Sequence, residues 1–284
     1  MASPPQRVTR TAAVQGIKIV YDSYGFGDEA LVFIHGWSCS RQLWASQSPL
    51  YETHRSILVD LPGHGDSDSP HIDYQIELFA HAVKVVVEQE RVRKVVLVAH
   101  SMGGPIATMF LRLFAPCPAA AVDAPSLQNS VIIAGIVYVD SFLHLPESYM
   151  TLQQRQSLGK SLEDDDAFIA KVNRLFTSDT GETVRETVLR TMLATPKHVR
   201  ARATTSKVIP HAMAYDEVYG QVPAINIVAP SCPPAHGHWF HHLPLLKIKK
   251  MTGVSHWLFL EKPEQFNMEV EGFLRDNNLL LNTN

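Results

Sequence analysis

The segment "VVLVAHSMGGPIATMFLRLFA", residues 95–115, is the strongest indication of the fold of this chain. Its first five residues are all apolar, which predicts a strand buried on both faces, and residues 105–115 have the apolar spacing of a helix. Between them, His100, Ser101 and two glycines allow only a tight turn. A strand, a tight turn and a helix in this order predict a nucleophile elbow that presents Ser101 above the sheet. The alternative is a turn that serves only to reverse the chain. Ala99 stands where this signature usually has its first glycine, and its added methyl group is small enough for the turn to close.

Short β-rich runs alternate with helical runs along most of the chain, and this order predicts an α/β fold with a mostly parallel sheet covered by helices. Between residues 141 and 220 only helical periodicity remains, which predicts a helical insertion. We therefore expect residues 1–140 and 221–284 to form the two parts of one core domain, and residues 141–220 to form a helical cap. The predicted strands are residues 18–25, 30–36, 55–63, 94–100, 131–140, 223–229 and 245–251, and the predicted core helices are 76–90, 105–115 and 263–277.

The composition is that of an ordinary globular protein. Of the 284 residues, 45% are hydrophobic and 19% are charged, and the formal net charge is −3. No dense Lys/Arg run occurs, which argues against a nucleic-acid or membrane surface. Residues 1–13 lack the apolar segment of a secretory signal, and no apolar stretch approaches the roughly 18 residues of a membrane span. Cys39, Cys117 and Cys232 form neither a tight pair nor a metal-type cluster, so we expect reduced thiols and a cytoplasmic protein.

A serine nucleophile needs a base, and the chain contains 14 histidines that compete for this role. His256 is the best candidate because it follows the strand at 245–251, in a loop that leads to the last helix. Loops at the carboxyl ends of parallel strands gather over the same edge of a sheet. The alternative is a loop histidine without a catalytic role.

The base in turn needs a carboxylate to orient it, and the usual chain order places that acid between the serine and the histidine. Asp140 ends the predicted strand at 131–140 and is the best candidate. The strand at 223–229 carries no acidic residue near its carboxyl end, and Asp216 and Glu217 lie before that strand rather than after it. The alternative for Asp140 is a structural aspartate that caps the next helix.

Two backbone amides are the expected oxyanion donors. The amide of Met102 follows the nucleophile at the start of the predicted helix, where the helix dipole also favours negative charge. The second donor is expected from Trp37 in "VFIHGWS", because Gly36 lets the chain turn towards the site at the end of a strand. The alternative is a turn that merely ends this strand.

Four segments in this order, "FIHGWSCSRQLW", "VDLPGHGDSD", "VLVAHSMGG" and "GVSHWLFLEKPEQFN", resemble the α/β-hydrolase superfamily in its one-domain form with a helical cap. The resemblance covers almost the whole chain. It implies a mostly parallel eight-stranded sheet flanked by helices, with cap helices over the pocket. It also implies the roles of nucleophile, acid and base for Ser101, Asp140 and His256, and oxyanion amides at Trp37 and Met102.

Two smaller expectations follow from the same segments. Most members of this superfamily place the acid after the strand that corresponds to 223–229, and a minority place it one strand earlier, as Asp140 requires. In the second segment, Asp60, His64 and Asp66 are expected to hold a loop together rather than to take part in chemistry. The residues expected to line the substrate site are His35, Gly36, His100, Phe142 and Trp257, although buried aromatic side chains are more often part of the core.

The predicted function is a serine hydrolase that cleaves a carboxylic ester or lactone of a small, largely apolar molecule without a cofactor. One alternative keeps the triad but cleaves carbon–carbon bonds of diketone-type substrates or acts as a cofactor-free haloperoxidase. Another is a non-catalytic ligand receptor on the same fold. The segment "HGHWFHH", with His236, His238, His241 and His242, has a spacing that can bind zinc. Because no acidic or cysteine partner accompanies it, we expect no metal there.

Overall fold

The structure is a computed structural model that describes residues 6–115, 131–143, 150–205, 220–232 and 237–279. Its centre is one eight-stranded sheet with the strand order β1-β2-β4-β3-β5-β6-β7-β8. The first two pairings, β1 with β2 and β2 with β4, are antiparallel, and all the others are parallel. The predicted α/β fold with a mostly parallel sheet of eight strands is therefore confirmed.

The bounds of the elements match most of the predicted segments. The strands are β1 (Val8–Val14), β2 (Ile17–Tyr24), β3 (Glu29–Ile34), β4 (Ser56–Val59), β5 (Lys94–His100), β6 (Ile132–Val139), β7 (Ala224–Val228) and β8 (Leu246–Lys250). The helices are η1 (Arg41–Gln47), α1 (Ser48–Thr53), α2 (Ile76–Gln89), α3 (Gly103–Phe114), α4 (Leu152–Ser161), α5 (Asp165–Asn173), α6 (Glu182–Ala194), α7 (Lys197–Thr205), α8 (Gly237–His242), α9 (Leu258–Glu261) and α10 (Pro263–Asp276).

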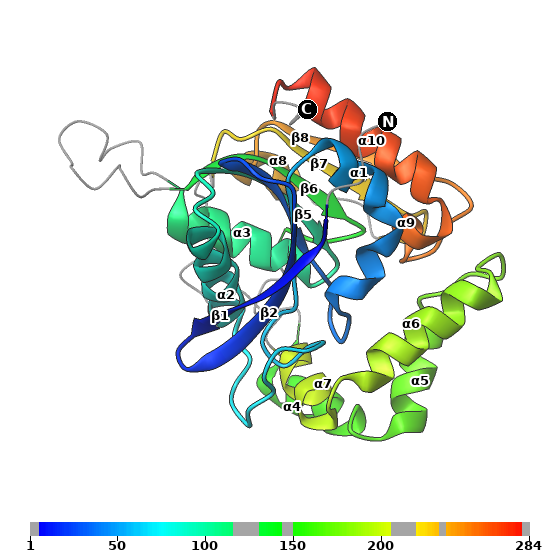
Figure 1. Ribbon diagram of the computed structural model, residues 1–284. Helices are drawn as coiled ribbons and strands as arrows, with labels where there is room; N and C mark the ends of the chain where they lie inside the picture. Colours follow the sequence, from blue (N-terminus) through cyan, green and yellow to red (C-terminus); the bar gives the residue numbers. More distant parts are fainter. Residues whose placement is uncertain (1–5, 116–130, 144–149, 206–219, 233–236, 280–284) are drawn as a thin grey trace.

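The central strands are apolar on both faces because helices cover both faces of the sheet. Residues 95–99 of β5 are completely buried, as are residues 30–34 of its neighbour β3. Figure 1 shows α2 and α3 on one side of the sheet and α1, α9 and α10 on the other. The two outermost strands differ, since β1 and β8 are mostly exposed. In β8, Lys247, Lys249 and Lys250 supply the charges that discourage edge-to-edge pairing.

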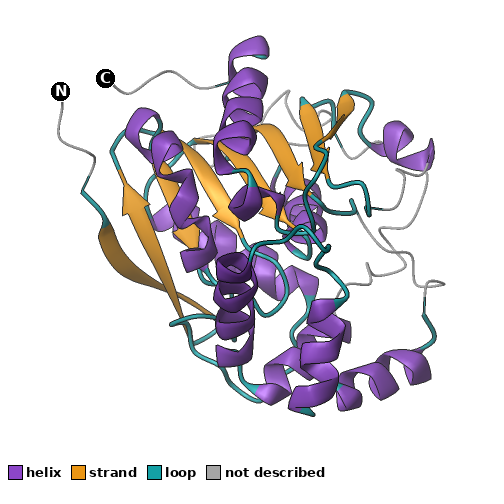
Figure 2. Ribbon diagram, turned by 90° about the vertical axis from the view of Figure 1, so that its right-hand side faces the viewer, coloured by secondary structure: helices purple, strands orange, loops and turns teal. Residues whose placement is uncertain are grey.

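The helices α4 to α7 form a separate group away from the sheet, at the bottom of both ribbon views (Figures 1 and 2). They fall within residues 141–220, where the sequence predicts a helical cap. The exact division into 1–140, 141–220 and 221–284 stays a prediction, and residues 144–149 and 206–219 lie outside the described part of the chain. In the described part, no helix combines the length and apolar character needed to cross a membrane.

Some elements carry too little sequence signal to be predicted. Strand β1 has five exposed residues out of seven, so its apolar alternation is short, and it forms by pairing along its whole length with β2. The helices η1, α1 and α8 are only 6 or 7 residues long. Helix α3 begins at Gly103, two residues before the predicted start.

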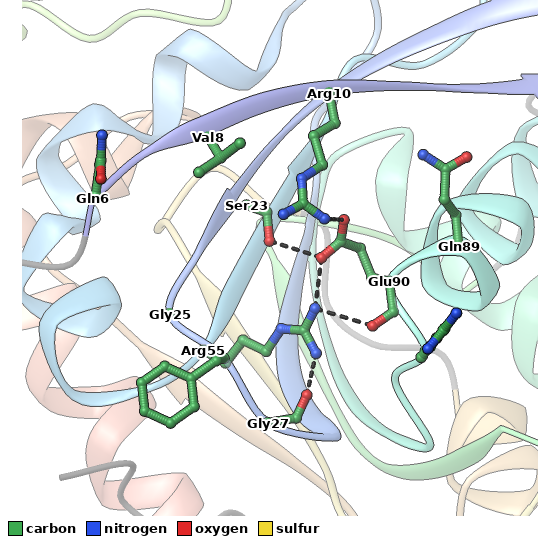
Figure 3. A pocket seen from close by; sticks show the side chains of 11 residues that line it. Gln6, Val8, Arg10, Ser23, Gly25, Gly27, Arg55, Gln89 and Glu90 are labelled. Carbon is green, nitrogen blue, oxygen red and sulfur yellow. Dashed lines mark hydrogen bonds and ion pairs between the residues drawn. The ribbon is translucent and has the colours of Figure 1, made fainter.

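A polar cavity of about 420 Å³ lies beside the β1–β2 hairpin, at the amino ends of the parallel strands (Figure 3). In it, Glu90 accepts hydrogen bonds from Arg10 at 2.9 Å, Ser23 at 2.9 Å and Arg55 at 2.5 Å. Burial alone would raise the pKa of Glu90, but hydrogen bonds from Tyr21, Ser23 and Arg55 outweigh burial and lower it. Because these charges pair with one another, the network fastens the hairpin to the end of α2, at the opposite end of the sheet from Ser101.

Candidate active site

Ser101 sits on a strained turn between β5 and α3. Its φ angle is +52°, in the left-handed region that non-glycine residues rarely adopt. The turn is held by its backbone: the Ser101 amide donates to Val139 O at 3.0 Å, and the Gly104 amide donates to Ser101 O at 3.0 Å. The Ser141 hydroxyl also donates to Ser101 O, at 2.5 Å. These bonds hold the elbow that the sequence predicts against the adjacent end of β6.

Gly103 allows this elbow to pack closely on strand β3. A Cβ atom at residue 103 would lie 2.5 Å from the backbone oxygen of Ile34 and 3.2 Å from that of His35. Real Cβ atoms do not approach backbone oxygen so closely, so a side chain here would push α3 away from the sheet. The glycine therefore sets how near the start of α3 comes to the end of β3.

Asp140 and His256 form a short hydrogen bond across 116 positions of sequence. His256 Nδ1 lies 2.6 Å from Asp140 Oδ2, and the side chains are 16% and 5% exposed. Because the carboxylate accepts at Nδ1, neutral His256 carries its proton on that nitrogen and leaves Nε2 available as a base. Asp140 also has a positive φ, at +44°, and its amide donates to Ile227 O at 2.8 Å. The structure thus brings together the predicted acid and the predicted base.

The second oxygen of Asp140 is held by the loop after β7. The Ala229 amide donates to Asp140 Oδ1 at 2.7 Å, and the Cys232 amide closes the turn by donating to Ala229 O at 3.1 Å. The Cys232 thiol hydrogen-bonds the Asp140 carboxylate, and burial, followed by this negative neighbour, raises the pKa of Cys232 to about 12. The thiol is therefore protonated at neutral pH and can donate to the carboxylate. The Asp140 carboxylate thus accepts hydrogen bonds from His256 and from the loop after β7. It does not cap the next described helix, α4, whose N-cap residue is Thr151.

The loop after β3 passes beside Ser101. A Cβ atom at Gly36 would lie 3.0 Å from Ser101 Cβ, which places the His35–Trp37 segment directly against the elbow. The Trp37 side chain is 4% exposed and points to the helical group, where its Nε1 donates to Arg200 O at 2.9 Å. Met102 is the N-cap residue of α3, so its amide is among those at a helix start that have no intrahelical partner. The two predicted oxyanion amides thus belong to segments that flank Ser101, and their role stays a prediction.

His35 and His64 stabilise the loops that follow β3 and β4 by hydrogen bonds to their backbone. His35 Nδ1 donates to Gly36 O at 2.8 Å, and its Nε2 accepts from the Leu61 amide at 3.1 Å. Both ring nitrogens are therefore used by backbone, which leaves His35 no polar atom for a substrate. Burial lowers the pKa of His35 well below its ordinary value and lowers that of His64 to about 4. Both side chains are neutral at pH 7.

Asp60 and Asp66 hold the same loop, as the sequence predicts, together with Arg41. Asp60 is fully buried and accepts from the Arg41 amide at 2.7 Å and from the Asp66 amide at 2.8 Å. The Arg41 guanidinium pairs with both Asp60 and Asp66. Burial raises the pKa of Asp60, and the Arg41 charge opposes that effect. This cluster is structural and lies at the base of the loop.

The remaining predicted lining residues have different surroundings. Trp257 is 1% exposed, and its ring packs against Phe176 at 4.7 Å between centroids, so it fills the space between the histidine loop and the helical group. Phe142 is half-buried and meets Trp239 edge-on at 5.9 Å. Phe142 lies two residues after the acid, Asp140. It is therefore a predicted lining residue that is both close to the acid and partly exposed.

The helical group contacts both loops that carry predicted site residues. The Thr195 hydroxyl donates to Ser38 O at 3.1 Å, and the His256 amide donates to Leu175 O at 3.4 Å. The Thr180 hydroxyl donates to Glu261 at 2.5 Å, and Glu261 in turn accepts from the Ser255 amide. The loops of Trp37 and His256 are therefore each tied to this group.

The histidine-rich segment forms helix α8. Of its four histidines, His236 and the side chain of His238 lie outside the described part of the chain, and His241 and His242 pack ring to ring at 5.7 Å. Among the described residues, no group of three or more His, Cys, Asp or Glu side chains is arranged to hold a metal ion. Cys117 also lies outside the described residues.

Sequence reasoning missed the polar groups that surround Asp140. Ala229 contributes only a backbone amide, which carries no side-chain signal. Cys232 could have been noticed because it closely follows a strand that neighbours β6, at the sheet edge where the site residues gather. Glu261 could not have been found from spacing alone, since it acts through the backbone of Ser255.

Comparison with known proteins agrees with the fold. A family model described as "Alpha/beta hydrolase family" matches residues 31–269, well over half of the chain. One curated relative is the 2-hydroxy-6-oxononadienedioate/2-hydroxy-6-oxononatrienedioate hydrolase of Escherichia coli (strain K12 / DH10B). It is 37% identical over 100 residues, which are 33% of this chain and 35% of that protein. The chain spans between 32% and 39% of the length of the curated relatives compared.

Solved structures extend the likeness over nearly the whole fold. A bromoperoxidase from Bacillus anthracis matches with a TM-score of 0.76 at 20% identity, over 95% of this chain and 100% of that chain. A malate-bound thermophilic esterase from Thermogutta terrifontis matches with a TM-score of 0.75 at 22% identity, over 96% and 99% of the two chains. At such low identity these likenesses show the shared fold alone.

Proposed function

This chain belongs to the alpha/beta hydrolase family, and on that premise we propose that it is a serine hydrolase that cleaves a carboxylic ester or lactone of a small, largely apolar molecule. The observation that carries the proposal is the 2.6 Å hydrogen bond between Asp140 and His256 Nδ1, next to a serine on a strained elbow. This bond fixes the tautomer in which Nε2 can accept a proton. Ser101, His256 and Asp140 are then nucleophile, base and orienting acid.

The reaction proceeds through an acyl-enzyme. Ser101 Oγ attacks the substrate carbonyl carbon while His256 Nε2 takes the hydroxyl proton, and Asp140 stabilises the resulting imidazolium. The amides of Trp37 and Met102 donate to the oxyanion. The imidazolium then gives its proton to the leaving alcohol. Water attacks the acyl group with His256 as base, and Ser101 is released. Each step uses groups of this chain and one water molecule, so we propose no metal or organic cofactor.

The substrate preference is supported by the side chains near the acid and the base. Phe142 is half-buried beside Asp140 and meets Trp239 edge-on, whereas Trp239 and Trp257 are each only 1% exposed. A partly exposed aromatic ring beside the acid favours a substrate with an apolar group, such as a small, largely apolar ester or lactone. The predicted partner is accordingly a small-molecule substrate.

The direct test is hydrolysis of short p-nitrophenyl esters and a lactone panel by the wild-type chain and by Ser101→Ala. We expect turnover by the wild type and loss of at least about 10³-fold in kcat for the variant. Wild-type rates in Ser101→Ala would overturn the mechanism, because hydrolysis would then need a different nucleophile.

A second candidate is hydrolysis of a carbon–carbon bond in a diketone-type substrate by the same three residues. It is favoured by the 37% identity, over 100 residues, to a relative named 2-hydroxy-6-oxononadienedioate/2-hydroxy-6-oxononatrienedioate hydrolase. The products decide between the two: ester cleavage releases an alcohol, whereas carbon–carbon cleavage releases two carbonyl fragments. A chain that turns over neither substrate class would favour the ligand-receptor alternative.

A further inference from the structure

His100 lies where three segments of the site meet. It is the last residue of β5, directly before Ser101, and only 1% of it is exposed. On the side of the loop after β3, a Cβ atom at Gly36 would lie 2.9 Å from His100 Nδ1 and 3.0 Å from Ser101 Cβ. On the side of the histidine loop, the ring centroids of His100 and His256 lie 4.7 Å apart. The His100 ring is therefore in contact with two loops that come from distant parts of the chain.

A hydrogen bond joins His100 to the backbone of His256. His100 Nε2 lies 3.0 Å from His256 O, across 156 positions of sequence. A carbonyl oxygen has no proton to give, so the Nε2–H of His100 is the donor. The amide of His256 donates in turn to Leu175 O at 3.4 Å. Both backbone polar groups of His256 are thus used, one towards the elbow and one towards the helical group.

The two contacts of His256 restrain different motions. The bond between His256 Nδ1 and Asp140 Oδ2 fixes one edge of the imidazole, but the ring can still pivot about that edge if its backbone moves. The bond from His100 to the carbonyl restrains that backbone. Aromatic packing holds His100 itself, since the ring of Phe259 lies 4.9 Å away and meets it edge-on.

We infer that His100 is a positioning residue, which uses its Nε2–H to hold the backbone of His256 where the imidazole reaches Ser101. The inference deepens the proposed function and rests on it. It gives His100 a different role from the substrate contact that the sequence suggests. Displacement of a reacting group by about 1 Å can lower a rate by about 10²-fold, so a single hydrogen bond at this point has a measurable effect.

Two amide variants separate the hydrogen bond from the bulk of the side chain. In His100→Gln the amide nitrogen reaches about as far as Nε2 and can still donate to His256 O. In His100→Asn the side chain is shorter, and its nitrogen falls near the position of Nδ1. We expect kcat for p-nitrophenyl ester hydrolysis to fall by about 10- to 100-fold in His100→Asn with little change in KM, and to stay within about threefold of wild type in His100→Gln. His81→Asn, an exposed histidine on α2, is the matched control and should match the wild type.

A second measurement follows the position of His256 without any substrate. The proton in the short bond between His256 Nδ1 and Asp140 should give a low-field proton NMR signal. We expect this signal to persist in His100→Gln and to broaden or vanish at a lower temperature in His100→Asn, because the loop then moves more. Thermal unfolding of both variants checks that they remain folded.

The outcomes separate the inference from the proposed function. Wild-type kcat and an unchanged NMR signal in His100→Asn would overturn the positioning role, as would equal losses of kcat in both variants. If the wild-type chain hydrolyses no ester or lactone, the proposed function fails. The NMR comparison of the two variants then still decides whether His100 positions His256.

Discussion

Replacement of Asp140 by asparagine tests the arrangement of the acid and the base. In the native chain, Asp140 Oδ1 accepts from the Ala229 amide at 2.7 Å and Oδ2 faces His256 Nδ1 at 2.6 Å. The asparagine oxygen will stay with Ala229, because an NH₂ group there would place two donors against each other. The NH₂ group then faces His256 Nδ1 and forces that nitrogen to accept. The proton moves to Nε2, and His256 can no longer take the proton of Ser101.

The size of the effect follows from the lost charge and the wrong tautomer. A carboxylate and an imidazolium with charge centres about 4 Å apart attract each other by about 4 kcal/mol at an effective dielectric constant of about 20. Loss of that attraction in the transition state corresponds to about 10³-fold in rate. The wrong tautomer adds to this, so we expect kcat to fall by about 10³- to 10⁴-fold in Asp140→Asn.

The assay is steady-state hydrolysis of a p-nitrophenyl ester, with thermal unfolding to confirm that the variant is folded. Asp28→Asn is the matched control, because Asp28 forms an exposed pair with Arg93 at the other end of the sheet and should leave kcat unchanged. If Asp140→Asn keeps kcat within about tenfold of wild type, the assignment of Asp140 as the orienting acid is wrong.

Three further predictions concern stability. Glycine accommodates the +52° φ of residue 101, so Ser101→Gly should be more stable than Ser101→Ala by about 1 kcal/mol in urea unfolding, and equal stabilities would argue against strain at the elbow. Gly103→Ala should lower the free energy of unfolding by about 1–3 kcal/mol, because its Cβ would lie 2.5 Å from Ile34 O; an unchanged urea midpoint would contradict this close packing. Burial lowers the pKa of His64 from 6.5 to about 4, so the unfolded chain binds more protons between these values. Above pH 6.5 His64 is neutral in both states and does not change the free energy of unfolding. As the pH falls from 6.5 to 4, the unfolded chain gains a proton that the buried imidazole does not, and the free energy of unfolding falls by roughly 3 kcal/mol. His64→Asn, which can still donate to Pro62 O, should show a weaker fall of stability over this range, and a fall as steep as in the wild type would refute the burial argument.

The parts of the fold that sequence predicts best are those with a long apolar run or a tight turn. The strand at 95–99 and the turn at Ser101 are specified by their own residues. Five consecutive apolar residues favour a strand buried on both faces, and the glycines that follow favour a tight turn. Strand β1 was not predicted because its outer residues are exposed and its conformation depends on the partner strand β2. Its existence follows from pairing rather than from its own composition.

The site also contains residues that the sequence could predict and contacts that it could not. Asp140 and His256 could be proposed as partners because each follows a parallel strand, and the carboxyl ends of such strands meet at one edge of the sheet. The hydrogen bond from His100 to His256 O and the thiol of Cys232 beside Asp140 could not be predicted. They depend on how loops separated by up to 156 residues pack together. The substrate-lining role of His35 stays a prediction; its Nδ1 donates to the carbonyl of its neighbour Gly36, and its Nε2 accepts from the Leu61 amide, which only the fold brings near.

Reaction with a fluorophosphonate, followed by peptide mass spectrometry, tests most directly whether Ser101 is an activated nucleophile. We expect a single covalent adduct on the peptide that contains Ser101 in the folded wild-type chain, much slower labelling in Asp140→Asn, and none in Ser101→Ala. A folded wild-type chain that stays unlabelled, or that carries the adduct on another residue, would show that Ser101 is not an activated nucleophile.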